Sequence, residues 1–173
     1  MRAKKIKKIW FWIGLASFII GLSVLSIFAY KHISRELYKQ KLLNECVVFE
    51  IPELDIKVPV MDGTDNEVLS VAAGHFPETG RVGFGNYCIA GHSSTIYAEI
   101  FNDLKNIEIG AELYLYDNDT NKTCYTYEVT EKFIVNPEET WILGDFEDNR
   151  ITIVTCTDDG TQRMVVVGER YER

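Results

Sequence analysis

The sequence is poor in the residues that build metal centres or disulfide frameworks. Its 173 residues include only four cysteines and three histidines, and no two cysteines form a C-x-x-C pair. Structural zinc sites place ligands at such short spacings, so we expect no metal and no cofactor. Cys88 lies in an apolar run and is expected to be a small core residue. A disulfide between Cys46 and Cys124 is compatible with the sequence, which does not establish it.

Positive charge is also scarce outside one segment. The net charge is −8, although the N-terminus from Arg2 to Lys8 is strongly basic, so the rest of the chain is more acidic than the total implies. Because phosphate binding requires a basic face, this composition argues against nucleic acid as a partner.

Charge is absent altogether from Trp10 to Tyr30, a stretch about as long as the ~20 apolar residues that cross a bilayer. A cleaved signal peptide is the alternative, but this run is longer than a usual signal core of about 7–15 residues. The preceding basic cluster should stay cytoplasmic. We therefore expect a cytoplasmic tail over residues 1–9, a plasma-membrane anchor over 10–30, a stalk over 31–45 and an extracellular domain over 46–173.

Helical periodicity is rare after residue 46, where short β-type runs alternate with turn residues. Short helices are possible only at Asp65–Val71 and Ser94–Leu104. Seven or eight short strands favour a mainly β fold that closes into a barrel. The expected strands are Val47–Ile51, Ile56–Val60, Tyr87–Ala90, Glu112–Tyr116, Thr123–Val135, Ile151–Thr155 and Met164–Gly168.

Three side chains are placed where strands begin or end. Cys156 follows the strand Ile151–Thr155, and Arg163 starts the next strand after a short loop. A loop this short predicts antiparallel neighbours, with both side chains at one rim. His92 lies just after another strand, and the sequence alone does not bring it to that rim.

These residue types suit acyl transfer. A cysteine thiolate attacks a carbonyl, an imidazole moves the proton, and a guanidinium stabilises the oxyanion. Simpler interpretations are open for each residue: a core cysteine, a loop histidine and a solvated strand-end arginine. His75 is a competing histidine that we expect in a turn.

Several motifs, in their order along the chain, resemble those of the sortase family, membrane-anchored cysteine transpeptidases of Gram-positive surfaces. The family's T-L-x-T-C strand appears as Thr152–Cys156, with Ile153 in place of leucine. The resemblance extends from about Val48 to Gly168. The other matching segments are A-G-H at Ala90–His92, the arginine before an apolar strand at Arg163, I-P-x-L-x-I at Ile51–Ile56, and G-H-x-P at Gly74–Pro77.

The resemblance implies an eight-stranded sortase-type barrel in which Cys156 is the nucleophile, His92 the general acid and base, and Arg163 the oxyanion or substrate stabiliser. It also implies that Thr155 and Ala90 bind substrate beside the cysteine. The implied substrates are secreted proteins with a C-terminal L-P-x-T-G-like signal, which is cleaved after threonine, and the implied acceptor is an amine of a peptidoglycan precursor.

The sequence is most similar to class D sortases, with class A as the near alternative. A pilin-polymerising enzyme and a non-catalytic, membrane-tethered β-barrel binding domain are the other functions to be considered.

Overall fold

The computed structural model describes residues 2–94 and 99–171. It divides into two compact units, Met1–Gln40 and Lys41–Arg173. Helix α1, Arg2–Glu45, forms the first unit and ends within the second. Its segment Trp10–Glu45 is long and apolar enough to cross a membrane, as expected for an anchor. The helix continues through residues 31–45 without a break.

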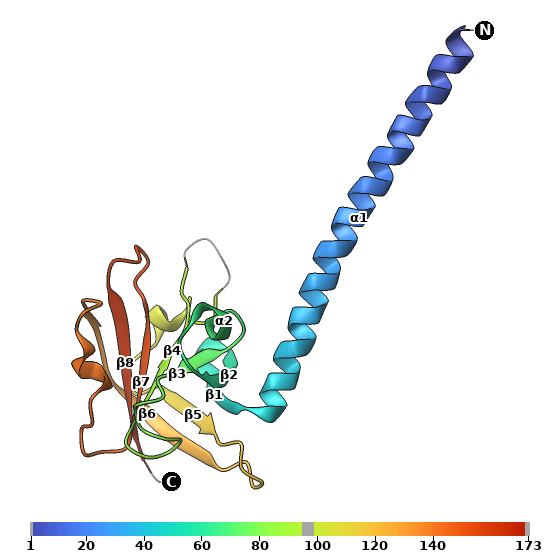
Figure 1. The fold of residues 1–173 in the computed structure, drawn as a ribbon. Helices are drawn as coiled ribbons and strands as arrows, with labels where there is room; N and C mark the ends of the chain where they lie inside the picture. Colours follow the sequence, from blue (N-terminus) through green and yellow to red (C-terminus); the bar gives the residue numbers. More distant parts are fainter. Residues whose placement is uncertain (1, 95–98, 172–173) are drawn as a thin grey trace. The chain divides into compact units, whose positions relative to one another are not determined.

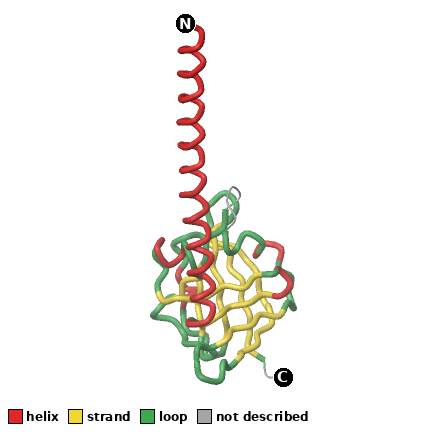
Figure 2. The backbone as a smooth tube through the Cα atoms, turned by 90° about the vertical axis from the view of Figure 1, so that its right-hand side faces the viewer, coloured by secondary structure: helices red, strands yellow, loops and turns green. Residues whose placement is uncertain are grey.

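The second unit is a closed eight-stranded barrel, which confirms the predicted fold class (Figure 1). Around the wall the strand order is β1-β2-β3-β4-β7-β8-β6-β5. Figure 2 shows the strands, in yellow, curving into this wall. The strands are β1 Val47–Ile51, β2 Ile56–Asp62, β3 Ala73–His75, β4 Asn86–Ala90, β5 Glu112–Tyr116, β6 Cys124–Val135, β7 Arg150–Cys156 and β8 Arg163–Arg170.

The short helices differ in part from expectation. Helix α2, Asn66–Leu69, is a single turn capped by the Asp65 carboxylate. Instead of a helix over Ser94–Leu104, only the 3-10 turn η2, Leu104–Asn106, is present among the residues described there, and residues 95–98 lie outside them. Two further 3-10 turns were not expected, η1 at Pro52–Leu54 and η3 at Thr140–Leu143.

All four cysteines are free thiols. Cys88 is fully buried, as predicted. Strand register explains why Cys46 and Cys124 do not pair. Val48 on β1 lies opposite Tyr116 on β5, and Tyr116 lies opposite Cys124 on β6, so β5 separates the two cysteines.

The barrel wall has two apolar faces. The inner face forms the main core, and Ile151 and Ile153 of β7 belong to it. Because side chains alternate along a strand, Thr152, Val154 and Cys156 share the outer face. A second buried cluster covers this outer face, and its members are Val135, Ile142, Val154, Val165 and Val167, with Phe76, Phe133 and Leu143 packed against them.

A β-bulge in β6 divides that strand between the two faces. The register with β8 shifts between Val129 and Glu131. Tyr125, Tyr127 and Val129 face the core, whereas Phe133 and Val135 pack in the second cluster on the outer face. An extra residue in one strand reverses the facing of all side chains beyond it. Because of the bulge, the side chains of Phe133 and Val135 in the second half of β6 point to the outer face.

The segment between β6 and β7 covers part of this outer face (Figure 1, orange). Asn86 of β4, only 2% exposed, holds it in place. The Asn86 amide Nδ2 donates to the carbonyl oxygens of Ile142 at 2.9 Å and Gly144 at 2.8 Å, and its Oδ1 accepts from the Thr152 hydroxyl at 2.6 Å. One buried side chain thus joins β4, β7 and the covering segment.

Candidate active site

Cys156 and Arg163 lie opposite each other at one end of the barrel wall. They are register partners in the antiparallel pair β7–β8, as the short loop predicted. Both side chains are partly exposed. The loop between them closes on the Asp159 carboxylate, which accepts hydrogen bonds from the Thr157 hydroxyl at 2.6 Å and the Thr161 hydroxyl at 2.8 Å.

His92 reaches the same rim through the parallel pairing of β4 with β7. Ala90 is the register partner of Val154 in the last pair of the two strands, and His92 follows Ala90 by two residues as Cys156 follows Val154. The Gly91 amide continues the ladder by donating to the Val154 carbonyl at 3.2 Å. Since paired strands lie about 4.8 Å apart, this pairing brings the segment just before His92 alongside the end of β7 that carries Cys156.

Packing on the other side of the His92 backbone fixes this segment. The Phe101 amide donates to the His92 carbonyl at 3.0 Å. A Cβ atom on Gly91 would lie only 2.4 Å from the ring of Phe101. Glycine is therefore required for the Phe101 ring to pack closely against the backbone just before His92.

Ala90 and Thr155 lie on opposite faces of the wall. Ala90 shares the outer face with Val154 and is partly exposed. Thr155 is only 2% exposed, and its hydroxyl donates to the Gly91 carbonyl at 2.8 Å. The Thr155 side chain therefore contacts the segment just before His92, and it points away from the outer face on which Cys156 lies.

The family model of the sortase domain matches residues 49–171. The chain belongs to the sortase family. It is 31% identical to Sortase A of Bacillus anthracis over 69% of this chain and 56% of that protein. It spans about half of the length of this and the other Sortase A relatives it matches.

Solved sortase structures share the fold. Sortase C-1 of Actinomyces oris superposes with a TM-score of 0.68 at 28% identity, covering 73% of this chain and 74% of that one. A Sortase D5 transpeptidase of Clostridium perfringens gives a TM-score of 0.66 at 28% identity, covering 79% of this chain and 89% of that one.

His75, which was expected in a turn, is instead the last residue of strand β3. It is 9% exposed, and its ring stacks on Tyr87 with centroids 4.3 Å apart. Its Nδ1 lies 3.0 Å from the Asp62 carboxylate and its Nε2 lies 2.9 Å from the Gly80 carbonyl. These contacts connect β2, β3 and the loop before β4, so the contacts of His75 are those of a residue that stabilises the fold.

No three acidic, cysteine or histidine side chains gather as a metal-binding group within residues 2–94 and 99–171. In the acidic segment between β6 and β7, two carboxylates already have partners close by in the chain. Glu139 accepts from the Asn136 amide at 2.7 Å, and Asp148 is ion-paired with Arg150.

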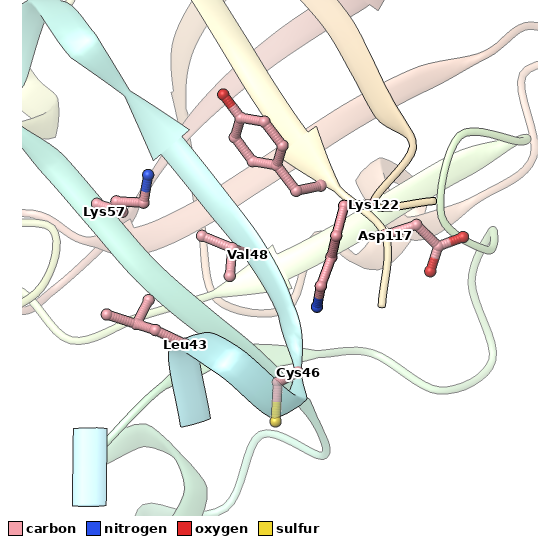
Figure 3. A pocket seen from close by; sticks show the side chains of 7 residues that line it. Leu43, Cys46, Val48, Lys57, Asp117 and Lys122 are labelled. Carbon is pink, nitrogen blue, oxygen red and sulfur yellow. The ribbon is translucent and has the colours of Figure 1, made fainter. Parts of the chain in front are cut away.

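A pocket of about 190 Å³ lies on the far wall of the sortase barrel, where α1 leads into β1 (Figure 3). It is bounded by Leu43, Cys46, Val48, Lys57, Tyr116, Asp117 and Lys122. The lysines already have partners, because Lys57 bonds Glu50 at 2.6 Å and Lys122 caps the Asn44 carbonyl at 3.2 Å. Burial raises the pKa of the Cys46 thiol. Three strands lie between β1 and β7 in either direction around the wall, so this pocket is remote from Cys156.

Proposed function

We propose that this sortase is a membrane-anchored cysteine transpeptidase that cleaves an L-P-x-T-G-like sorting signal after its threonine. One observation supports the proposal: Cys156 and Arg163 are register partners on β7 and β8, and β4, which ends two residues before His92, pairs with β7 on its other side. A nucleophile, a proton carrier and a fixed cation are the groups that acyl transfer by a thiol requires.

The first half of the reaction forms a thioester. The Cys156 sulfur, as a thiolate, attacks the threonine carbonyl, and the electron pair of the C=O bond moves onto the oxygen. Collapse of this tetrahedral intermediate breaks the C–N bond. The leaving amine takes its proton from the imidazolium of His92, which becomes neutral.

The second half transfers the acyl group. An amine of a peptidoglycan precursor attacks the thioester, neutral His92 accepts its proton, and the thiolate of Cys156 leaves. Arg163 keeps its charge throughout and donates hydrogen bonds to the oxyanion or to the substrate backbone. Ala90 borders the bound signal on the outer face, whereas Thr155 positions His92 through Gly91.

The proposed partners are secreted proteins that carry a C-terminal sorting signal. We propose that α1 crosses the plasma membrane once, with the basic N-terminus in the cytoplasm and the barrel outside. The charge asymmetry around the apolar segment supports this orientation.

Among sortase classes, we propose class D, with class A as the near alternative. The likeness to a Sortase D5 structure supports class D, and the Sortase A relatives support class A. Likeness to a pilus-related Sortase C of Group B Streptococcus, with a TM-score of 0.67 at 27% identity, makes a pilin-polymerising enzyme the second candidate. Such an enzyme would use a pilin lysine as the attacking amine.

The test uses the full chain in detergent micelles with a fluorogenic L-P-x-T-G peptide. We expect Cys156→Ala to abolish cleavage while the thermal transition stays unchanged, and hydroxylamine to release a threonine hydroxamate only from the unsubstituted protein. Cys124→Ala, which removes an exposed thiol of β6, is the matched control.

Unchanged cleavage by Cys156→Ala would refute the proposal and favour a non-catalytic binding domain. Competition between a lysine-bearing pilin peptide and a wall-precursor amine then separates the two enzymatic alternatives.

A further inference from the structure

The loop between β7 and β8, residues 157–162, connects Cys156 to Arg163 and is held by side chains from other parts of the chain. Lys105 of η2 donates from its Nζ atom to both carboxylate oxygens of Asp158, at 3.0 and 2.9 Å. Building on the proposed function, we propose that Lys105 is a positioning residue for the reaction. Its ion pair with Asp158 holds the β7–β8 loop in the place that lets Cys156 react.

The loop is a compact unit, so a contact at one of its residues restrains all of it. The Thr157 amide donates to the Gln162 carbonyl at 3.1 Å, and the Gln162 amide donates back to the Thr157 hydroxyl at 3.1 Å. The Gly160 amide donates to the Thr157 carbonyl at 2.8 Å. Asp158 lies within this bonded turn, two residues after Cys156. A tether at Asp158 therefore restrains the whole loop close to the candidate nucleophile.

Lys105 is itself attached to the barrel through its backbone. Leu104, the residue before it, is fully buried in the main core, and so is Ile107. The Nζ atom of Lys132 on β6 donates to the Lys105 carbonyl at 3.1 Å and to the Ile107 carbonyl at 2.7 Å. The Lys105 side chain therefore extends from a fixed point of the barrel, and its ion pair fixes the loop to that point.

The segment that carries Lys105 also contacts the backbone of His92. Phe101 is fully buried, and its amide donates to the His92 carbonyl at 3.0 Å. The Phe101 carbonyl in turn accepts from the Leu104 amide at 3.2 Å, which connects it to η2. The segment 101–107 therefore contacts His92 through Phe101 and the β7–β8 loop through Lys105. It sets the two sides of the candidate active site relative to each other.

A second hydrogen bond holds the other end of the loop. The Nε2 atom of Gln162 donates to the Oδ1 atom of Asn136 at 3.2 Å, where the segment between β6 and β7 begins. The loop is thus restrained on two sides, by a charged pair at Asp158 and by a neutral bond at Gln162. Removal of the Lys105 charge leaves the bond at Gln162 in place and releases the part of the loop next to Cys156.

Exposure determines how large this effect can be. The Lys105 and Asp158 side chains are 48% and 56% exposed. An exposed ion pair contributes little to global stability and shifts a local equilibrium by up to about fivefold. Salt weakens such a pair, because the Debye length falls from about 10 Å at 0.1 M to about 3 Å at 1 M. The effect of Lys105 on the rate should therefore depend on salt, unlike the effect of a buried structural residue.

The test measures kcat and KM for the fluorogenic L-P-x-T-G peptide, with the full chain in micelles at low salt and at about 1 M NaCl. At low salt, we expect Lys105→Met and Asp158→Asn each to lower kcat by about three- to fivefold, with KM and the thermal transition nearly unchanged. The double variant should lose no more than either single variant, because both substitutions remove the same contact. Lys105→Arg, which can keep a bidentate pair, should restore most of the rate.

At about 1 M NaCl, kcat of the unsubstituted chain should fall to that of Lys105→Met. The matched control is Lys57→Met, which breaks an ion pair of 2.6 Å with Glu50 on the far wall and should leave kcat unchanged. Equal kcat values for Lys105→Met and the unsubstituted chain at low salt would overturn the inference. So would a loss that persists at high salt, or additive losses in the double variant.

If the unsubstituted chain cleaves no peptide, the proposed function fails, and NMR then tests the tether separately. Backbone order parameters of residues 158–162 should fall in Lys105→Met and stay unchanged in Lys57→Met. Unchanged order parameters in Lys105→Met would show that the ion pair does not hold the loop, whatever the activity.

Discussion

Replacement of Asn86 by alanine tests how the outer face is held together. The amide of Asn86 makes three hydrogen bonds, to the Ile142 carbonyl, the Gly144 carbonyl and the Thr152 hydroxyl. Truncation removes all three at once and leaves their partners without the side chain that satisfied them. The segment between β6 and β7 would then be attached mainly by the apolar contacts of Ile142 and Leu143.

The size of the effect follows from the burial of these groups. A hydrogen bond contributes about 1 kcal/mol net, and an unsatisfied buried partner costs about 1–3 kcal/mol. Three bonds made by a side chain that is 2% exposed give an expected loss of about 3 kcal/mol in the free energy of unfolding. That is a large part of the ~5–15 kcal/mol available to a domain.

Urea denaturation of the full chain in micelles measures this loss directly. Trp141 lies in the covering segment, so its emission should shift to the red in Asn86→Ala before global unfolding. Asn121→Ala, an exposed asparagine between β5 and β6, is the matched control and should change neither quantity. A loss below about 1 kcal/mol with unchanged Trp141 emission would refute the reasoning, because it would mean that the three bonds hold nothing in place.

Two further predictions concern titratable groups. Burial raises the pKa of the Cys88 thiol to about 11, so at pH 8 only about one molecule in a thousand carries the Cys88 thiolate. A maleimide should therefore label exposed Cys124 in the folded chain and react with Cys88 only after unfolding. Equal labelling rates for the two thiols in the folded chain would contradict this. Hydrogen bonds from the Thr157 hydroxyl, and then from Thr161, lower the pKa of Asp159 to about 2. Because this pKa is depressed on folding, the carboxylate stabilises the β7–β8 loop above about pH 4, and the effect disappears as the pH falls toward 2. NMR titration should show the Thr161 amide shifting with a midpoint near 2, and Asp159→Asn should abolish that transition; a midpoint near the ordinary 3.8 would show that these bonds are not formed in solution.

Local patterns were sufficient to predict most of the wall. Val47–Ile51 and Glu112–Tyr116 match strands β1 and β5 at both ends, because their turn residues terminate the runs sharply. Strand β3 was missed. Its three residues, Ala73–His75, carry no β-type signal, and they form a strand only because Gly74 and its neighbours pair with both β2 and β4.

The candidate site shows the same division. The short loop between Cys156 and Arg163 was enough to predict their antiparallel pairing, since few residues allow no other connection. The position of His92 depends on a parallel pairing between strands far apart in the chain, for which no local signal exists. The role of Asn86 was missed for a similar reason, because its partners Ile142 and Thr152 lie more than fifty residues away.

Sequence by itself determined the acidic barrel domain, the apolar N-terminal helix, the strand ends that carry Cys156 and Arg163, and the family motifs. Tertiary structure alone decided which face each side chain occupies. The clearest case is β6, whose alternating pattern places Tyr127, Val129 and Phe133 on one side. The bulge after Val129 turns Phe133 to the outer face, since one additional residue reverses a period of two. The β6 side chains that lie on the outer face are therefore decided by pairing with β8, and the β6 pattern did not contain that information.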